Sequence, residues 1–320
     1  MADGSVVGWG KDDYGQATPP DGLKAIAVSA GDTHSLAIRP DGSVVGWGKD
    51  NYGQATPPEG LKAIAVTSVG IIGGGSASYA IRPDGTVAAW GRLNYYSGGT
   101  DGLFIPPDGL IATAIAGSYM HAYAIRPDRS VVGWGYNRAG LATPPDGLEA
   151  IAISAGGANT GGLGGVAPPP RTAHAVAIRP DGSVVGWGED NYGQATPPEG
   201  LKAIAVSAGS AHCLAIRPDG SVVGWGYNYY GQATPPDGLK AIAVSAGDTY
   251  SLAIRPDGSV VGWGENYYGQ ATPPDGLKAI AVSAGSAYGL AIAGVPDIPI
   301  VTPSRRRRAA WMNMERPAFF

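Results

Sequence analysis

The sequence DGSVVGWG occupies residues 41–48 and recurs unchanged at 3–10, 181–188, 219–226 and 257–264. Degenerate copies stand at 84–91 and 128–135. Successive Trp-Gly pairs are therefore 38, 43, 44, 53, 38 and 38 residues apart. A repeat of this length, rich in strand-forming residues, is typical of propellers and solenoids. We interpret the repeated tryptophans as structural residues that pack between units: Trp9, Trp47, Trp90, Trp134, Trp187, Trp225 and Trp263.

One full unit predicts four short strands, here called A to D. Strand A covers residues 24–29, strand B 34–39, strand C 43–48 and strand D 53–56. The turn between B and C contains Pro-Asp-Gly, in which proline presets φ and glycine tolerates a positive φ. Strands A and C are apolar on both faces, as expected for a blade covered by neighbours on both sides. The pattern therefore predicts a four-stranded antiparallel blade.

The two ends of the repeat array predict a closed ring. The last unit supplies strands A (278–283) and B (288–292), whereas the chain begins with strand C at residue 3. The N-terminal strands C and D would complete the blade begun by the C-terminal strands A and B, which removes the exposed sheet edge. We predict an all-β, seven-bladed β-propeller over residues 1–292 and a basic, disordered tail over 293–320.

Composition narrows the classes of function. The formal charge is −4; the tail carries five arginines against two acidic residues, so the repeat body carries −7. An acidic body argues against nucleic-acid binding through the propeller. The alternative nucleic-acid site is the tail, through Arg305, Arg306, Arg307 and Arg308. No apolar run has the length of a membrane span and no signal peptide is visible, so we expect a monomer that is cytoplasmic by default.

The repeats also resemble a known family. The motifs Trp-Gly-x-Asn/Asp-x-Tyr-Gly-Gln and Ala-Gly-x-x-His-Ser-Leu-Ala-Ile-x-x-Asp-Gly look like repeats of the regulator of chromosome condensation family of seven-bladed propellers, over roughly residues 3–292. Their short length and the Gly-Gln-Ala-Thr-Pro-Pro ending are most similar to bacterial members such as beta-lactamase inhibitory protein II. The resemblance implies the fold, whereas propellers host many unrelated functions.

Length variation among the units is confined to one end of the predicted propeller. The A–B loop of the second unit has five extra residues around 70–76, the C–D loop of the third has six around 93–105, and the A–B loop of the fourth has fifteen around 157–171. In an up-and-down blade these loops share one end, here called the variable end. The B–C turns and D–A connectors, nearly invariant, share the other, here called the uniform end. Binding residues concentrate on such variable loops.

The loops of the variable end supply the candidate partner-binding residues. The C–D loops are rich in tyrosine, which offers a large contact area at low entropic cost. In the inhibitory protein that the chain resembles, aromatic and acidic loop residues bind a target protein, and the matching A–B slots add further candidates. The candidates are Asp32, His34, Tyr119, Met120, His121, Tyr136, Tyr227, Tyr229, Asp248, Tyr250 and Tyr288. The tyrosine directly before Gly-Gln in each C–D loop fits blade packing and partner contact equally well.

Motifs of catalysis and of metal binding are absent from the sequence. All four histidines share one repeat slot that opens strand B, which favours a structural role over a metal cluster. The glycine-rich stretch 156–165 lacks the Gly-Lys-Ser/Thr ending of a phosphate loop. Cys213, the only cysteine, stands where other units have serine or alanine, so we interpret it as a small packed residue. We predict no enzyme activity, no cofactor and no metal.

These observations predict a non-enzymatic scaffold that presents its tyrosine-rich loops to another protein, of unknown identity, in a bacterial setting. The acidic body favours a partner with a basic surface. One alternative is a guanine-nucleotide-exchange or chromatin-type regulator of a small GTPase, which by the resemblance would require a projecting β-wedge. None of the three insertions has the sequence of a clear hairpin. A second alternative is an inhibitor of a secreted bacterial enzyme such as a beta-lactamase.

Overall fold

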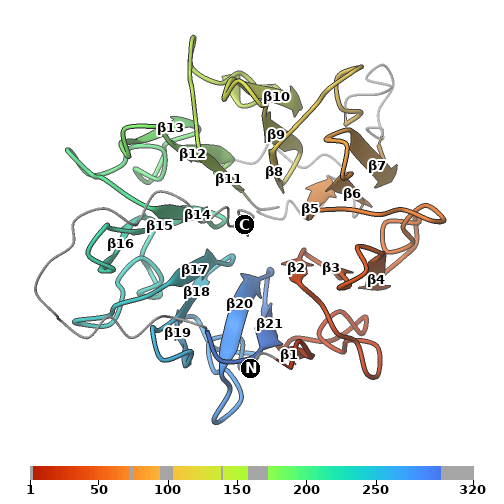
Figure 1. Cartoon of the computed structure of the whole chain (residues 1–320). Coiled ribbons are helices and arrows are strands. Elements are labelled where there is room, and N and C mark those ends of the chain that lie inside the picture. The colour runs from red at the N-terminus through yellow and green to blue at the C-terminus, as the bar shows by residue number, and fades with distance from the viewer. Residues whose placement is uncertain (1–2, 72–74, 94–103, 138–139, 158–171, 297–320) are drawn as a thin grey trace, which may run out of the picture.

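Seven antiparallel sheets, one from each repeat, surround a central axis in the computed structural model (Figure 1). The structure describes residues 3–71, 75–93, 104–137, 140–157 and 172–296. Each sheet has three strands, and the order within a sheet follows the chain in six of the seven. The all-β, seven-bladed propeller predicted from the repeats is confirmed.

Each blade has an inner, a middle and an outer strand, which correspond to the predicted strands A, B and C. The inner strands lie nearest the axis (Figure 1): β2 (Ala27–Ala30), β5 (Ala65–Ile71), β8 (Ala114–Ser118), β11 (Ala152–Gly156), β14 (Ala205–Ala208), β17 (Ala243–Ala246) and β20 (Ala279–Ala284). The middle strands are β3 (His34–Ile38), β6 (Gly75–Ile81), β9 (His121–Ile125), β12 (His174–Ile178), β15 (His212–Ile216), β18 (Tyr250–Ile254) and β21 (Tyr288–Ala293). The outer strands are β4 (Val44–Gly48), β7 (Val87–Gly91), β10 (Val131–Gly135), β13 (Val184–Gly188), β16 (Val222–Gly226), β19 (Val260–Gly264) and β1 (Val6–Gly10).

The seventh blade combines the two ends of the described chain. Strand β1 pairs antiparallel with β21, in a register that places Val6 opposite Ile292 and Trp9 opposite Gly289. Strand β20 pairs with the other edge of β21. The outer strand of this blade therefore comes from the start of the sequence, and its inner and middle strands come from the end of the repeat array.

The predicted fourth strand is wrong. Residues 53–56 form turns, in which the Gly53 amide donates to the Asp50 carbonyl and the Thr56 amide donates to the Gly53 carbonyl. The Asp50 carboxylate accepts hydrogen bonds from the Ala55 amide and the Thr56 hydroxyl. These local bonds occupy the polar groups that a fourth ladder would need. The segment covers the outer strand at Gly46, where an added Cβ would lie 2.4 Å from the Ala55 carbonyl oxygen.

The repeated tryptophans are buried between neighbouring blades, as predicted. Trp47 packs with Leu290 and Ile292 of the seventh blade, and its indole Nε1 donates to the Gln16 carbonyl oxygen at 2.9 Å. Trp225 repeats the contact with the Gln194 carbonyl at 3.0 Å. Each such bond joins an outer strand to the C–D loop of the preceding blade. Five of the tryptophans therefore hold adjacent blades together by apolar burial and a buried bond to a glutamine carbonyl, Trp187 donates instead to the Tyr123 hydroxyl, and Trp134 contributes apolar burial.

The second insertion lies in a different blade from the one that the sequence analysis predicted. Residues 70–76 and 93–105 both belong to the blade of β5, β6 and β7, so the assignment of the second insertion to the third unit was wrong. Strands β5 and β6 continue pairing through Val69–Ala77, Gly70–Ser76 and Ile71–Gly75, beyond the last pair that β2 and β3 make. The first insertion therefore extends a hairpin, contrary to our expectation from the sequence. Residues 94–103 and 158–171 lie outside the described residues.

The described ranges contain no helix with the length and apolarity that a bilayer-spanning segment needs.

Candidate functional site

Hydrogen bonds between backbone groups connect the A–B and C–D loops at the variable end. In six blades the residue after the Trp-Gly pair donates its amide to the carbonyl of the residue that precedes the middle strand, and in the blade of β6 Arg92 donates to Ser76 within that strand. Lys49 donates to Thr33 at 2.9 Å, and Tyr227 donates to Ala211 at 2.8 Å. The two classes of loop therefore emerge together, as the up-and-down blade predicts.

In six of the seven blades the first residue of the middle strand is fully buried. His212 Nε2 lies 2.9 Å from Ser251 Oγ, and His34 Nε2 lies 2.9 Å from Ser78 Oγ. Because Ser251 Oγ donates its own proton to the Gln232 carbonyl, His212 Nε2 is the donor to Ser251. Each bond joins a blade to the next one. The four histidines are therefore structural: His34, His121, His174 and His212.

Burial keeps these histidines neutral. Desolvation lowers the pKa of His34, His121 and His174 to about 4 and that of His212 to about 3. His174 Nε2 contacts the buried thiol of Cys213 at 3.1 Å, and burial raises the pKa of that thiol. Cys213 is thus a small packed residue, as predicted. Among the described residues no group of three or more His, Cys, Asp or Glu side chains is arranged to hold a metal ion.

Tyrosine takes the same position in two blades and also bonds across to the next blade. The Tyr250 hydroxyl donates to the Tyr288 carbonyl. The Tyr288 hydroxyl donates to the His34 carbonyl at 2.8 Å and lies 2.9 Å from Ser35 Oγ. Desolvation raises the pKa of both phenols. Neither ring reaches the surface.

The prediction that eleven residues contact a partner is therefore wrong for six of them. Their side chains are buried in the propeller, so they are not available to a partner in this structure: His34, Tyr119, Met120, His121, Tyr250 and Tyr288. Four of them begin a middle strand directly after a variable loop, where the neighbouring blade covers them. Tyr119 and Met120 form the turn between β8 and β9, and both side chains pack into the core. The remaining five candidates reach the surface fully or in part: Asp32, Tyr136, Tyr227, Tyr229 and Asp248.

The C–D loops of five blades carry exposed tyrosines, a set here called the tyrosine belt, and those of two neighbouring blades are in ring contact. Apart from the half-buried Tyr227, its members are 41–82% exposed. Tyr227 contacts Tyr192 of the preceding blade, with ring centroids 4.8 Å apart, and stacks on Tyr229. The belt comprises Tyr14, Tyr52, Tyr192, Tyr227, Tyr229, Tyr230, Tyr267 and Tyr268.

The tyrosine before Gly-Gln is half covered by the next blade. Lys49 Nζ lies 4.9 Å from the centroid of the Tyr14 ring, and Lys11 Nζ lies 5.1 Å from that of Tyr268. The other face of each ring reaches solvent. The two interpretations of this residue thus both describe part of it: it packs on a neighbouring blade and also exposes surface.

Two carboxylates lie at the mouth of the central channel. Loss of hydration there raises the pKa of Asp32. Loss of hydration and the negative charge of Asp32 raise the pKa of Asp248 to about 7, whereas a hydrogen bond from Ser210 opposes the shift. These groups add negative potential to the variable end when they are ionised.

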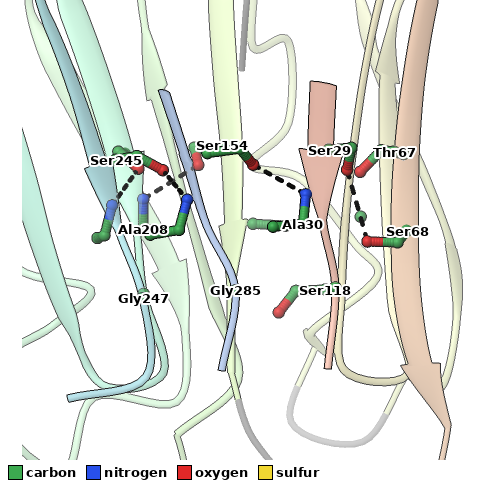
Figure 2. A pocket seen from close by; sticks show the side chains of 18 of the residues that line it. Ser29, Ala30, Thr67, Ser68, Ser118, Ser154, Ala208, Ser245, Gly247 and Gly285 are labelled. Carbon is green, nitrogen blue, oxygen red and sulfur yellow. Dashed lines mark hydrogen bonds between the residues drawn. The ribbon is translucent and has the colours of Figure 1, made fainter. Parts of the chain in front are cut away.

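The sequence interpretation missed a set of serines that line the channel (Figure 2). Ser154 Oγ accepts the Ala208 amide and Ser245 Oγ accepts the Ala284 amide, each across a blade boundary. The cavity that these hydroxyls border has a volume of about 130 Å³. A signal was present, because serine recurs at one position of the inner strand in five units: Ser29, Ser154, Ser207, Ser245 and Ser283.

The nucleic-acid site predicted in the tail stays a prediction. Arg305, Arg306, Arg307 and Arg308 lie outside the described residues, as does the tail beyond residue 296.

Comparisons with known proteins relate these repeats to one family. The model of the regulator of chromosome condensation (RCC1) repeat matches residues 25–54, 203–232 and 241–270. No curated protein matches the sequence.

Solved structures match the whole propeller. Prp20p from Saccharomyces cerevisiae aligns over 89% of this chain and 90% of its own, with 16% identity and a TM-score of 0.72. Human WBSCR16 aligns over 90% and 99%, with 14% identity and a TM-score of 0.69. The ectodomain of the Arabidopsis thaliana receptor kinase ACR4 aligns over 84% and 90%, with 23% identity and a TM-score of 0.62.

At these identities the structural likeness concerns the fold. The resemblance to short bacterial repeats such as those of beta-lactamase inhibitory protein II stays a prediction. The matched repeat model and the seven blades agree on the architecture. The chain is a seven-bladed β-propeller in which three stretches match the RCC1 repeat model.

Proposed function

We propose that this propeller is a non-enzymatic binding module that recognises another protein through the tyrosine belt. The belt is the observation that carries the proposal. Isolated exposed aromatic residues are ordinary on protein surfaces, whereas a contiguous group of them on neighbouring blades is typical of an interaction surface. Tyrosine is enriched at the energetic centres of protein interfaces.

The geometry of the belt favours tight recognition. Tyr192, Tyr227 and Tyr229 are in ring contact, and Tyr267 contacts Tyr268 with centroids 4.9 Å apart. These contacts restrict the rings before a partner arrives, so less side-chain entropy is lost on binding. The loops that carry them are attached to a rigid β framework, which is the usual arrangement of binding loops.

The charge of the variable end specifies a basic partner. The described loops there carry eight acidic and three basic residues, and the three basic groups lie over tyrosine rings. A positively charged surface is therefore attracted and oriented. The acidic residues are Asp12, Asp13, Asp32, Asp50, Glu189, Asp190, Asp248 and Glu265, and the basic residues are Lys11, Lys49 and Arg92.

Structures of the same fold support a binding role in general terms. The work on Prp20p describes its binding properties to Gsp1p and histones, and another structure shows Kap60 bound to yeast RCC1 (Prp20). Those partners are properties of those proteins. For this chain they support the class of function, binding to proteins.

Affinity capture from the native lysate followed by mass spectrometry tests the proposal. The full chain is compared with a Tyr229→Ala/Tyr267→Ala variant, which removes the two most exposed rings of the belt. A Glu199→Ala/Asp237→Ala variant, altered at exposed positions of the uniform end, is the matched control. We expect a partner that is retained by the control and lost by the tyrosine variant, with affinity that falls as salt is raised. Equal capture by all three proteins would contradict the proposal.

One observation favours a second candidate function, nucleotide exchange on a small GTPase. The extended hairpin of β5 and β6 projects at the variable end, where the sequence had shown no clear hairpin. An exchange factor of this kind would accelerate release of labelled GDP from a small GTPase. Shortening the hairpin to the length of the β2–β3 connection would abolish that acceleration. Unchanged GDP release in the presence of the full chain would exclude this candidate for the GTPase tested.

A further inference from the structure

The uniform end carries a group of exposed isoleucines that the binding proposal does not use. In five blades isoleucine directly precedes the inner strand, and in another it is the second residue of β20; five of these six side chains are 37–63% exposed. The sixth, Ile242, is half-buried against the core. We call this group the isoleucine ring: Ile26, Ile64, Ile151, Ile204, Ile242 and Ile280.

The backbone fixes these residues at one position in every blade. The Ile26 amide donates to the Ile38 carbonyl at 2.8 Å, and the Ile204 amide donates to the Ile216 carbonyl at 2.8 Å. Each bond lies at the end of the middle strand that leads into the B–C turn. Because the inner strands stand side by side around the axis (Figure 1), residues at this position encircle the channel at the uniform end.

Packing within the blade does not require isoleucine there. In the blade of β8, β9 and β10 the position holds Thr113, whose amide makes the same bond to the Ile125 carbonyl. Half-exposed isoleucine is costly in water, since each buried CH₂ contributes about 0.8 kcal/mol. An apolar ring repeated in six blades is therefore a surface suited to being covered.

The described chain ends beside this ring. After β21 the Gly294 amide donates to the Lys278 carbonyl at 2.9 Å, two residues from Ile280. Pro296 then lies over the B–C turn of the preceding blade, where a Cβ on Gly258 would be 2.7 Å from the Pro296 Cδ. Val295 between them is exposed. Residues 297–320 are therefore attached at the uniform end.

The composition of residues 297–320 complements the surface. The segment has Ile298, Ile300 and Val301 near its start, followed by four consecutive arginines at 305–308. Fully extended, 24 residues span up to about 80 Å, so reach is no limit. The uniform end as a whole carries fifteen acidic and twelve basic residues, a net charge of −3. The exposed acidic residues of its D–A connectors are Asp21, Glu59, Asp108, Asp146, Glu199, Asp237 and Asp275. Covalent attachment also gives the segment a high effective concentration.

We propose that residues 297–320 dock on the uniform end of their own propeller. The apolar residues 298–301 cover the isoleucine ring, and the arginines 305–308 pair with the acidic connectors. In this arrangement the tyrosine belt at the opposite end stays free.

Photocrosslinking of the full chain tests this arrangement. A benzoylphenylalanine at position 204, the most exposed member of the ring, is compared with one at position 267 on the opposite end. We expect intramolecular adducts with residues 297–320 from position 204 at least ten-fold above those from position 267. Replacing the four arginines by glutamine is expected to reduce these adducts several-fold. Adducts between two copies, equal yields from both positions, or no adduct with the segment would each overturn the proposal.

Limited trypsin digestion supplies a second measurement on the full chain. Docking protects the arginines 305–308, so an Ile204→Thr/Ile280→Thr variant should be cleaved there several-fold faster. Threonine is compatible with this position because Thr113 occupies it in another blade. An unchanged midpoint of chemical denaturation would show that the variant folds. Equal cleavage rates for the variant and the parent would contradict the proposal.

Discussion

The first residue of the middle strand and the C–D loop adjoin each other at the variable end, yet they have opposite fates. His212 and Tyr250 are fully buried and bond to the next blade, whereas Tyr229 and Tyr267 are the most exposed tyrosines of the described chain. Both positions vary among the repeats. Variation at the buried position therefore reflects pairing between neighbouring blades, and variation in the loop is free to serve recognition.

The pairs across blade boundaries show what the buried position does. Histidine meets serine in two pairs and cysteine in a third, and tyrosine meets backbone carbonyls. Each combination fills the space between two blades with a different hydrogen-bond donor and acceptor. A buried polar group without a partner costs about 1–3 kcal/mol, so the two residues of a pair depend on each other.

The largest effect should follow loss of a tryptophan between blades. Trp225→Ala removes a buried ring and its bond to the Gln194 carbonyl, which should lower the free energy of unfolding by about 3–5 kcal/mol. Chemical denaturation of the full chain measures this loss. A loss no greater than that of Tyr229→Ala would remove our distinction between buried frame and recognition surface.

The buried histidines predict a pH dependence of stability. An unfolded histidine has a pKa of about 6.5, whereas burial lowers the pKa of His212 to about 3. The unfolded chain therefore binds more protons below pH 6.5, and stability is lost as the pH falls from there toward the folded pKa. Each such histidine should cost about 2 kcal/mol at pH 5, at about 1.4 kcal/mol per pH unit.

His212→Ala separates this effect from packing. Alanine occurs at the same position as Ala77, so the variant should fold. At pH 7 it should be about 2–3 kcal/mol less stable than the parent, because a cavity forms and Ser251 loses a partner. Between pH 7 and pH 5 this difference should shrink by about 2 kcal/mol. A difference independent of pH would mean that His212 is not buried in its neutral form.

A single hydroxyl distinguishes the two kinds of tyrosine. Tyr288→Phe removes one of the two hydrogen bonds to the His34 carbonyl, which keeps the Gly31 amide as a donor, and should cost about 0.5–1.5 kcal/mol. Tyr268→Phe removes a hydroxyl from the half-exposed ring of the belt and should change stability by less than about 0.5 kcal/mol. Thermal and chemical denaturation of the two variants check the contrast. Similar losses would indicate that the belt is part of the frame.

The smallest effect on stability should coincide with the largest effect on binding. Tyr229→Ala should change the free energy of unfolding by no more than about 0.5 kcal/mol, since the ring is mostly exposed. The same change should weaken capture of the partner at least several-fold, as measured by titration once the partner is identified. Destabilisation by several kcal/mol would show that the loop supports the fold.

Much of the architecture could be predicted from the repeats. The seven Trp-Gly pairs located the outer strands, and the apolar runs located the inner strands to within three residues at their ends. The fourth strand was predicted wrongly because residues 53–56 have the same sequence pattern as a short strand. The bonds from the Asp50 side chain, which favour turns, are visible only in the structure.

The candidate site was predictable only in part. The sequence placed tyrosines such as Tyr227 and Tyr229 in exposed loops, and the structure agrees. It also offered Tyr250 and Tyr288 as partner contacts at the start of strand B, where the structure buries both side chains. Periodicity could not reveal this, because exposure at a strand start depends on which neighbouring blade covers it.

The sequence by itself determined the repeat, the number of blades and the division into a uniform and a variable end. These follow from local turn chemistry and from apolar periodicity, which each unit carries within itself. The tertiary structure decided which residues of the variable end are surface, how the channel serines bond, and where the isoleucine ring lies. All three depend on contacts between units some 40 residues apart, and such contacts form only when neighbouring blades are packed together.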